Sequence, residues 1–554
     1  MTPSAAAGLA VKLVIAVPVV AGLAGVTVPA FGYLPAIGAD SVDLAAFAAF
    51  AGRPGMAHSA ALSAGTALVA TLVSLGAAAL ILAASYGTRA MAVTDRLLAP
   101  LLSVPHAAAA LGFTLLFAPS GLVLRLLSPW ATGLTAPPDI ALVKDPWGIA
   151  MTAALVMKET PFLVLMGLAA LAQTEPRQRV QLARSLGYGR MAAFLHGVWP
   201  LVYRQIKLPV LAVLAFSVSV VDVAMILGPT RPAPLAVRIL NELTAPDVSA
   251  WLVGSAGAVL LLALMLALVL VWTALERLAG RGLAALRASG RRARHDGAVR
   301  LAALAFASAL TATMTLAVAG LAVQSVAGYW PFPDVAPTNM GLAVWQSRMG
   351  DHLATLGTTL AVALGATAIA LPLAVTLLAS GVTVGGIIYL PLIVPQVAFL
   401  FGLAILTIAA GLTAGPVLVT LSHALFTLPY ALIALSGPWR ALDARYEMAA
   451  RSFGVPRWRR FVTVRLALLT RPLCVAAALG MAVSVALYVP TRIIGGGRVA
   501  TVTTEAVAAA TGGDRRLVAM LALIQLALPF VAFAVARGVP AFLFRHRRAM
   551  QGRV

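Results

Sequence analysis

The chain has 554 residues, of which 61% are hydrophobic and only 10% are charged. This composition excludes a soluble globular protein and indicates a polytopic helical membrane protein. The formal net charge of +22 does not indicate a nucleic-acid-binding protein, because the arginines gather in short segments between apolar runs, as in the cytoplasmic loops of membrane proteins.

Twelve apolar segments are long enough to span a membrane, since about 20 residues of helix cross roughly 30 Å of hydrocarbon. In chain order they are residues 11–30, 61–84, 98–117, 148–172, 208–228, 250–274, 301–323, 353–378, 385–410, 416–437, 472–490 and 517–536. We interpret the first as a retained span and not as a signal peptide, because no clear Ala-x-Ala cleavage site follows it. The sequence therefore predicts an all-α fold of about twelve transmembrane helices.

The distribution of arginine and lysine predicts the topology. Basic residues concentrate in four regions, 177–207, 277–300, 440–471 and the tail from Arg545, and such loops stay in the cytoplasm. Both termini are therefore predicted to be cytoplasmic. Residues 279–300 form a basic linker between a first six-span unit, 1–278, and a second, 301–554.

A short arginine-centred segment occurs twice in the chain. Ala183, Arg184, Ser185 and Gly187 recur in register as Ala450, Arg451, Ser452 and Gly454, 267 residues later (451 − 184 = 267). Each copy follows the fourth span of its unit. A helix that ends at a glycine, followed by a second amphipathic stretch, is expected at both places, because glycine readily adopts the left-handed conformation that turns the chain.

Other matches extend this repeat over the two units. Pro105 and Gly112 correspond to Pro395 and Gly402, Pro161 corresponds to Pro429, and Pro229-Thr-Arg is similar to Pro490-Thr-Arg. The offset between matched residues falls by 22 between the third and fourth spans (290 − 268 = 22), which predicts an external insertion in the first unit over residues 119–144. Two parallel six-span repeats are expected to be related by an axis along the membrane normal, with a pathway between them.

At the repeated loops the chain resembles the permease subunits of binding-protein-dependent ABC importers, in particular the fused two-domain permeases of the thiamine and ferric-iron type. Their mark is Glu-Ala-Ala, three residues, then Gly. The second copy reads Glu447-Met-Ala-Ala-Arg-Ser-Phe-Gly454, with the acid one residue early, and the first copy lacks the acid. The resemblance implies that these loops couple the permease to an ATPase through Gln181, Leu182, Ala183, Arg184, Gly187, Glu447, Ala449, Ala450, Arg451 and Gly454.

The resemblance also implies the partners: two copies of a cytoplasmic ATPase and an external solute-binding protein. None of the four lysines follows a glycine, so the chain has no Gly-Lys-Ser/Thr phosphate loop of its own and the ATPase is expected to be another polypeptide. No catalytic, cofactor or metal site is predicted. The family resemblance favours a thiamine-like or metal cation as the solute.

Three charged residues stand out deep inside predicted spans, where each costs roughly 2.5–3.5 kcal/mol on insertion scales. They are Lys158, Glu159 and Asp222. One interpretation makes them a polar lining of the pathway, with Lys158 offsetting a carboxylate; the other makes them a structural ion pair packed between helices. His106 and His423 are weaker candidates, which a hydrogen bond to a neighbouring carbonyl would explain equally well.

Two other classes of function share features with this sequence. A secondary transporter of the major facilitator type also has twelve spans in two halves, but its basic signature lies between the second and third spans of each half, and here the repeated loop follows the fourth. A membrane enzyme is disfavoured because the sequence has no clustered acid-base or metal-binding constellation.

Overall fold

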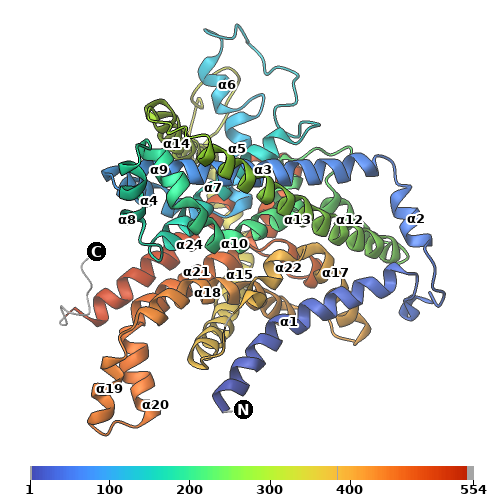
Figure 1. Ribbon diagram of the computed structural model, residues 1–554. Helices are drawn as coiled ribbons and strands as arrows, with labels where there is room; N and C mark the ends of the chain where they lie inside the picture. The colour runs from blue at the N-terminus through green and yellow to red at the C-terminus, as the bar shows by residue number, and fades with distance from the viewer. Residues whose placement is uncertain (1–2, 384, 546–554) are drawn as a thin grey trace.

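The computed structural model describes residues 3–383 and 385–545, and within these ranges the chain is helical, without β-strands (Figure 1). Most of the basic C-terminal tail, residues 546–554, lies outside the described residues. The helices of the first unit are α1 (Pro3–Ala30), α2 (Ala45–Ala51), α3 (Met56–Ser85), α4 (Arg89–Leu102), α5 (His106–Phe117), α6 (Leu122–Leu127), α7 (Ile149–Leu171), α8 (Pro176–Ser185), α9 (Arg190–Gly197), α10 (Trp199–Ser219), α11 (Asp222–Leu227), α12 (Leu235–Leu243) and α13 (Ala250–Ala288).

The second unit has α14 (Gly297–Val326), α15 (Ala343–Ala379), α16 (Leu390–Ile393), α17 (Gln396–Ala409), α18 (Pro416–Ala441), α19 (Arg445–Ser452), α20 (Arg457–Arg460), α21 (Thr470–Ala486), α22 (Val489–Ile494), α23 (Val502–Gly512) and α24 (Arg515–Leu543). Short 3₁₀ turns occur at Pro35–Ile37 and Gly386–Tyr389, and a π-helical turn at Phe461–Leu466. In the described ranges ten helices are long and apolar enough to span a membrane, and two bent pairs raise the number to twelve if each pair is one span. The expected all-α polytopic fold is confirmed.

Several predicted spans are interrupted at prolines. The segment 98–117 divides into α4 and α5 at Pro105, and the segment 385–410 bends by 85° between the residues before Pro395 and α17. A residue that precedes proline is driven out of the helical region, and Val394 has the extended φ of −74° and ψ of 131°. The prediction of one continuous helix for each of these segments is therefore wrong.

The first long helix of each unit packs against the other unit. Helix α1 crosses α17 so closely that a Cβ added at Gly402 would lie 1.9 Å from the carbonyl oxygen of Gly22. Helix α14 crosses α5 in a similar way, and a Cβ added at Gly112 would lie 2.8 Å from the Cβ of Ala317. Small residues allow such close helix packing within a membrane. Gly112 and Gly402, which correspond to each other in the sequence repeat, therefore lie at similar helix–helix crossings.

Much of the predicted linker is helical. Helix α13 continues to Ala288 and α14 begins at Gly297, so only residues 289–296 of the expected 279–300 are outside a helix. The arginine, alanine and leucine residues of 279–288 are strong helix formers, which explains the extension.

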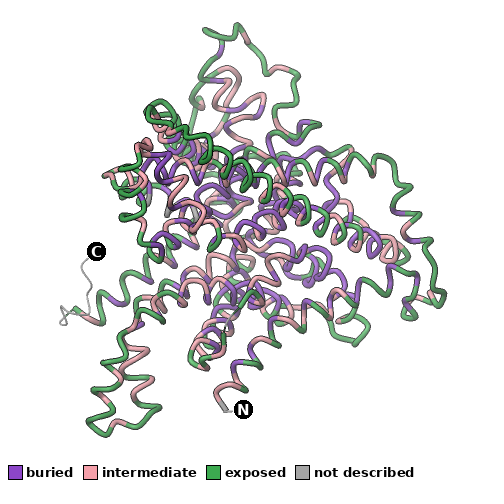
Figure 2. The backbone as a smooth tube through the Cα atoms, viewed as in Figure 1, coloured by how far each residue is buried: buried purple, intermediate pink, exposed green. Residues whose placement is uncertain are grey.

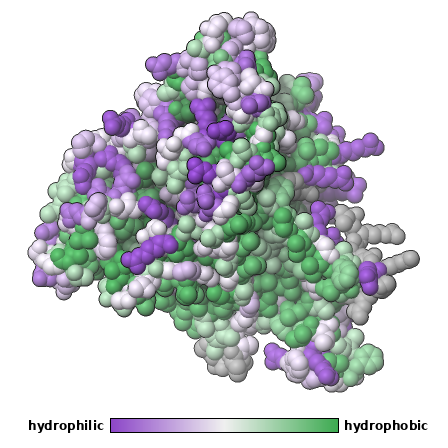
Figure 3. All heavy atoms as spheres, turned by 180° about the vertical axis from the view of Figure 1, so that it is seen from behind, coloured by the Kyte–Doolittle hydropathy of each residue, from purple (hydrophilic) through white to green (hydrophobic). Residues whose placement is uncertain are grey.

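Buried residues concentrate in the centre of the helix bundle, whereas α19, α20 and the segment around α6 are mostly exposed or half-buried (Figure 2). Seen from behind, the surface has a broad hydrophobic area, with hydrophilic side chains gathered above it and at its edges (Figure 3). Helices α8 and α9 lie at the left of the view in Figure 1 and α19 and α20 project at the lower left, while α2 lies at the right and α6 at the top.

Candidate coupling loops and translocation cavity

The two copies of the repeated loop fold in the same way. In the first, Gly187 has a φ of +86°, its N–H donates to Arg184 O at 2.9 Å, and the next N–H, that of Tyr188, donates to Ala183 O at 3.3 Å. In the second, Gly454 has a φ of +73°, its N–H donates to Arg451 O at 2.9 Å, and the next N–H donates to Ala450 O at 3.2 Å. Both are Schellman-type helix ends, which need a residue with positive φ at the glycine position.

These helices expose apolar side chains. On the first loop Leu182 and Leu186 are 66% and 59% exposed, and on the second Met448 and Phe453 are 59% and 85% exposed. Each loop thus places two large apolar side chains on its exposed surface. Of the ten residues predicted for coupling, Ala183, Gly187, Glu447 and Ala450 are half-buried and the other six are exposed.

Glu447 does not extend toward solvent. Its carboxylate lies 3.3 Å from the Arg465 guanidinium, which in turn lies 4.4 Å above the Trp439 ring. The acid that the family pattern places here therefore attaches α19 to the following helical segment. In the first copy the corresponding residue is Val180 (447 − 267 = 180), which is buried.

The residues between α13 and α14 pack on the first loop, a contact that the sequence did not predict. Gly189 N donates to Arg292 O at 3.2 Å, Arg292 donates to the Tyr188 hydroxyl at 2.9 Å and covers its ring, and Asp296 accepts from Met191 N. Burial, and to a smaller degree the charge of Arg287, lowers the pKa of the neighbouring His196. At Gly454 in the second loop, by contrast, an added Cβ would meet no atom within 4 Å.

The three intramembrane charged residues line one central cavity of about 220 Å³ between the two units. Lys158 and Glu159 come from α7, and Asp222 is the first residue of α11; all three are at least 94% buried. The second unit contributes Tyr389, Gln396, Phe426, Tyr430 and Tyr488 to the same walls. The structure therefore brings the predicted pathway residues together.

The partners within the cavity differ from those expected. Lys158 Nζ donates to the carbonyl oxygens of Leu101 and Val104, at 2.9 and 2.6 Å, where the chain breaks between α4 and α5. Glu159 Oε1 lies 3.0 Å from His106 Nε2, and the His106 ring packs 4.6 Å from Phe216. His106, rated a weak candidate from the sequence, is thus a direct partner of Glu159. Its position just after Pro105, at a broken span, is the signal that could have identified it.

His423 is a structural residue, and its partners are hydroxyls and not the expected carbonyl. It is 1% exposed and lies 2.8 Å from Ser484 Oγ and 2.9 Å from Thr491 Oγ1. Thr491 donates its own hydrogen to Leu487 O at 3.0 Å, so it accepts from Nε2 of the ring. Both ring nitrogens are therefore satisfied within the protein.

One sequence match is not supported by the helix boundaries. Helices α10 and α11 end at Ser219 and Leu227, and α21 and α22 end 267 residues later, at Ala486 and Ile494. At this offset Asp222 corresponds to Val489, and Pro490-Thr-Arg lies inside α22 whereas Pro229-Thr-Arg follows α11. That similarity is coincidental. In the repeat, Lys158, Glu159 and Asp222 correspond to the uncharged residues Phe426, Thr427 and Val489, so the charges of the cavity come from the first unit alone.

Comparisons with known proteins identify the family. The chain is 33% identical over 436 residues to the inner membrane ABC transporter permease protein YnjC of Escherichia coli K12, covering 78% of each chain. The thiamine transport system permease protein ThiP of Escherichia coli K12 is 32% identical over 123 residues, 22% of this chain and 23% of that protein. ThiP of Salmonella typhimurium LT2 is 40% identical over 68 residues, 12% of this chain and 13% of that protein.

A comparison with models of protein families gives no match. The similarity to YnjC nevertheless covers most of both chains, and the helices agree with it: ten to twelve candidate spans make this a multi-pass protein of the inner membrane. The relatives are named as permease proteins of transport systems. The chain therefore belongs to the family of ABC transporter permeases.

Proposed function

We propose that this chain is the membrane subunit of an ABC importer that passes a small organic cation to the cytoplasm, driven by two copies of a separate ATPase that dock on the α8 and α19 loops. An external binding protein delivers the solute. The observation that carries the docking proposal is the pair of matching helix ends with exposed apolar side chains, Leu186 and Phe453 among them. In this topology both termini and residues 289–296 are cytoplasmic.

The composition of the cavity supports the solute class. Two acidic side chains, Glu159 and Asp222, line the cavity together with one lysine and with aromatic rings from both units. Aromatic faces attract organic cations, and carboxylates offset their charge. A bare metal ion would prefer a cluster of oxygen or nitrogen ligands, and in the described residues no group of three or more His, Cys, Asp and Glu side chains is arranged to hold one. The name of the ThiP relatives makes thiamine the first compound to test.

Docking is tested by co-purification of the permease with a co-expressed ABC ATPase from the same organism. We expect Leu186→Asp combined with Phe453→Asp to abolish co-elution, because each substitution places a charge in the apolar contact. Met340→Asp is the matched control: Met340 is also apolar and 62% exposed, but it lies between α14 and α15, on the opposite side of the predicted topology. Unchanged co-elution of the double variant would refute the docking proposal.

The solute is tested by calorimetric titration of the solute-binding protein that supports uptake by this permease, with thiamine and with divalent and trivalent metal ions. Binding of thiamine, or of another organic cation in a competition screen, is the expected result. If the protein binds only a metal ion, the solute is a metal cation and the organic-cation proposal is wrong. If it binds an anion, the cation proposal as a whole is refuted. Neither result affects the docking proposal.

A further inference from the structure

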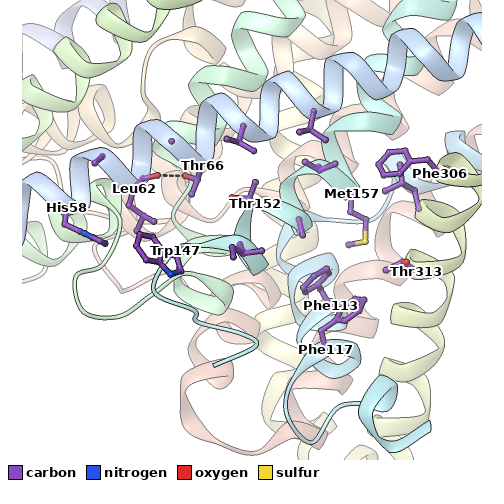
Figure 4. Close-up of a pocket in the computed structure, with 18 residues that line it drawn as sticks. His58, Leu62, Thr66, Phe113, Phe117, Trp147, Thr152, Met157, Phe306 and Thr313 are labelled. Carbon is purple, nitrogen blue, oxygen red and sulfur yellow. Dashed lines mark hydrogen bonds between the residues drawn. The ribbon is translucent and has the colours of Figure 1, made fainter. Parts of the chain in front are cut away.

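A second hollow lies away from the central cavity, in the membrane-spanning surface. It is a groove of about 860 Å³ among α3, α5, α7 and α14 (Figure 4). All four walls belong to candidate membrane spans. Val69, Val73 and Phe306 in these walls are 50%, 44% and 38% exposed, so the groove opens at the outer surface of the helix bundle, where the bilayer surrounds the protein.

The walls of the groove offer few free hydrogen-bonding groups to water. The hydroxyl of Thr66 donates to Leu62 O at 2.8 Å, the bond drawn in Figure 4, and that of Thr152 donates to Gly148 O at 2.8 Å. Both threonines therefore use their hydroxyls within their own helices. Filling the groove with water would need on the order of 30 molecules at about 30 Å³ each, and apolar cavities stay dry. The occupant must be apolar.

The two ends of the groove differ. His58 and Trp147 lie together at one end, near the N-termini of α3 and α7, and Phe306 and Thr313 lie at the other, with Phe113 and Met157 between (Figure 4). Tryptophan favours the membrane interface, where lipid headgroups lie. An amphiphile with a polar head at His58 and Trp147 and an apolar chain directed toward Phe306 fits this arrangement, and in a membrane that amphiphile is a phospholipid.

We propose that the groove is a binding site for an acyl chain of a phospholipid from the leaflet that surrounds the N-terminal end of α3. The site joins the two units, because α3, α5 and α7 belong to the first and α14 to the second. Space for the chain exists along α3, since a Cβ added at Gly65 would meet no atom within 4 Å. This inference concerns a surface separate from the coupling loops and does not depend on the proposed solute.

The first test uses the unaltered protein in native membranes that contain a phospholipid with a photoactivatable diazirine in its acyl chain. Val156 and Leu310 line the groove but are only 9% and 8% exposed, so lipid at the bulk surface has little access to them. After illumination we expect peptide mapping to find lipid adducts on these two residues. Adducts confined to outward-facing residues such as Leu270, which is 70% exposed, would overturn the proposal.

The second test measures retention through detergent purification. The wild type should keep phospholipid at close to one molecule per chain, and added phospholipid should raise its melting temperature, as a ligand that binds only the folded state does. Gly65→Phe and Val69→Trp place a ring in the groove and should abolish both effects. Gly76→Phe is the matched control, because an added Cβ at Gly76 on the same helix also meets no atom but Gly76 does not line the groove.

Either groove variant that folds and retains the wild-type amount of lipid overturns the proposal. The proposal is also overturned if the purified wild type carries detergent but no phospholipid. It is likewise overturned if a small membrane protein co-purifies with the wild type and is lost in Gly65→Phe, because the groove would then bind a protein.

Discussion

Replacement of Gly454 by valine should uncouple ATP hydrolysis from transport. Gly454 has a φ of +73°, and an added side chain would meet no atom within 4 Å, so the cost comes from the backbone and not from a steric clash with a neighbouring residue. A non-glycine residue pays about 1–2 kcal/mol in the left-handed conformation. A cost of about 1.4 kcal/mol corresponds to a tenfold change in population, so the loop should hold its docking conformation roughly tenfold less often.

The assay is performed in proteoliposomes that contain the permease and its ATPase, with the binding protein and solute added. Uptake and solute-stimulated ATP hydrolysis are measured together, and uptake per ATP hydrolysed should fall by roughly tenfold in Gly454→Val, in line with the backbone cost. Gly187→Val should behave similarly, with an added disturbance of the neighbouring Arg294, whose guanidinium lies 3.7 Å from the position of the new Cβ.

Gly538→Val is the control. This glycine is exposed near the C-terminal end of α24, lies within a helix, does not precede a proline and has open space around it, so valine there needs no left-handed conformation. Its uptake per ATP should equal that of the wild type. If Gly187→Val and Gly454→Val both match this control, the left-handed turns are not needed for coupling and the reasoning is refuted.

Three further predictions concern the cavity, the external side and the topology. Asp222→Asn and Glu159→Gln should alter uptake per folded molecule while the melting temperature stays near that of the wild type; a lowered melting temperature with normal uptake would instead make these residues a structural group. Arg125→Lys should weaken the attachment of the predicted insertion to the α14–α15 connection. The Arg125 guanidinium packs on the Trp330 and Phe332 rings and donates to the carbonyl oxygens of Ser120, Trp330, Pro331 and Asp334. The single ammonium of lysine cannot make all of these contacts. Loss of two such bonds at about 1.5 kcal/mol each predicts an increase of roughly 100-fold in hydrogen exchange of the 327–341 amides, and unchanged exchange would contradict it. In a Cys474→Ala background, a cysteine at Trp130, which is 77% exposed, should react with an impermeant external reagent in intact cells, and cysteines within 289–296 should not; the reverse pattern would invert the topology.

The sequence by itself determined the class of protein, the positions of the spans and the geometry of the repeated loops. These features depend on local properties: the length of an apolar run against the thickness of the bilayer, and the conformational freedom of Gly187 and Gly454. Each of the twelve predicted segments overlaps a candidate span or a bent pair, with ends that differ by up to about 15 residues where a helix continues past the apolar run.

Only the tertiary structure decided which distant residues meet. The break at Pro105 frees the carbonyls of Leu101 and Val104 to accept from Lys158, and it places His106 against Glu159 from a helix 53 residues away. The packing of α1 and α14 on the opposite unit, the packing of residues 289–296 on the first repeated loop and the enclosure of Arg125 by the α14–α15 connection arise in the same way. Hydropathy specifies how deep a residue lies in the membrane but not which helix lies beside it, because in lipid the neighbours are selected by side-chain shape and hydrogen bonding.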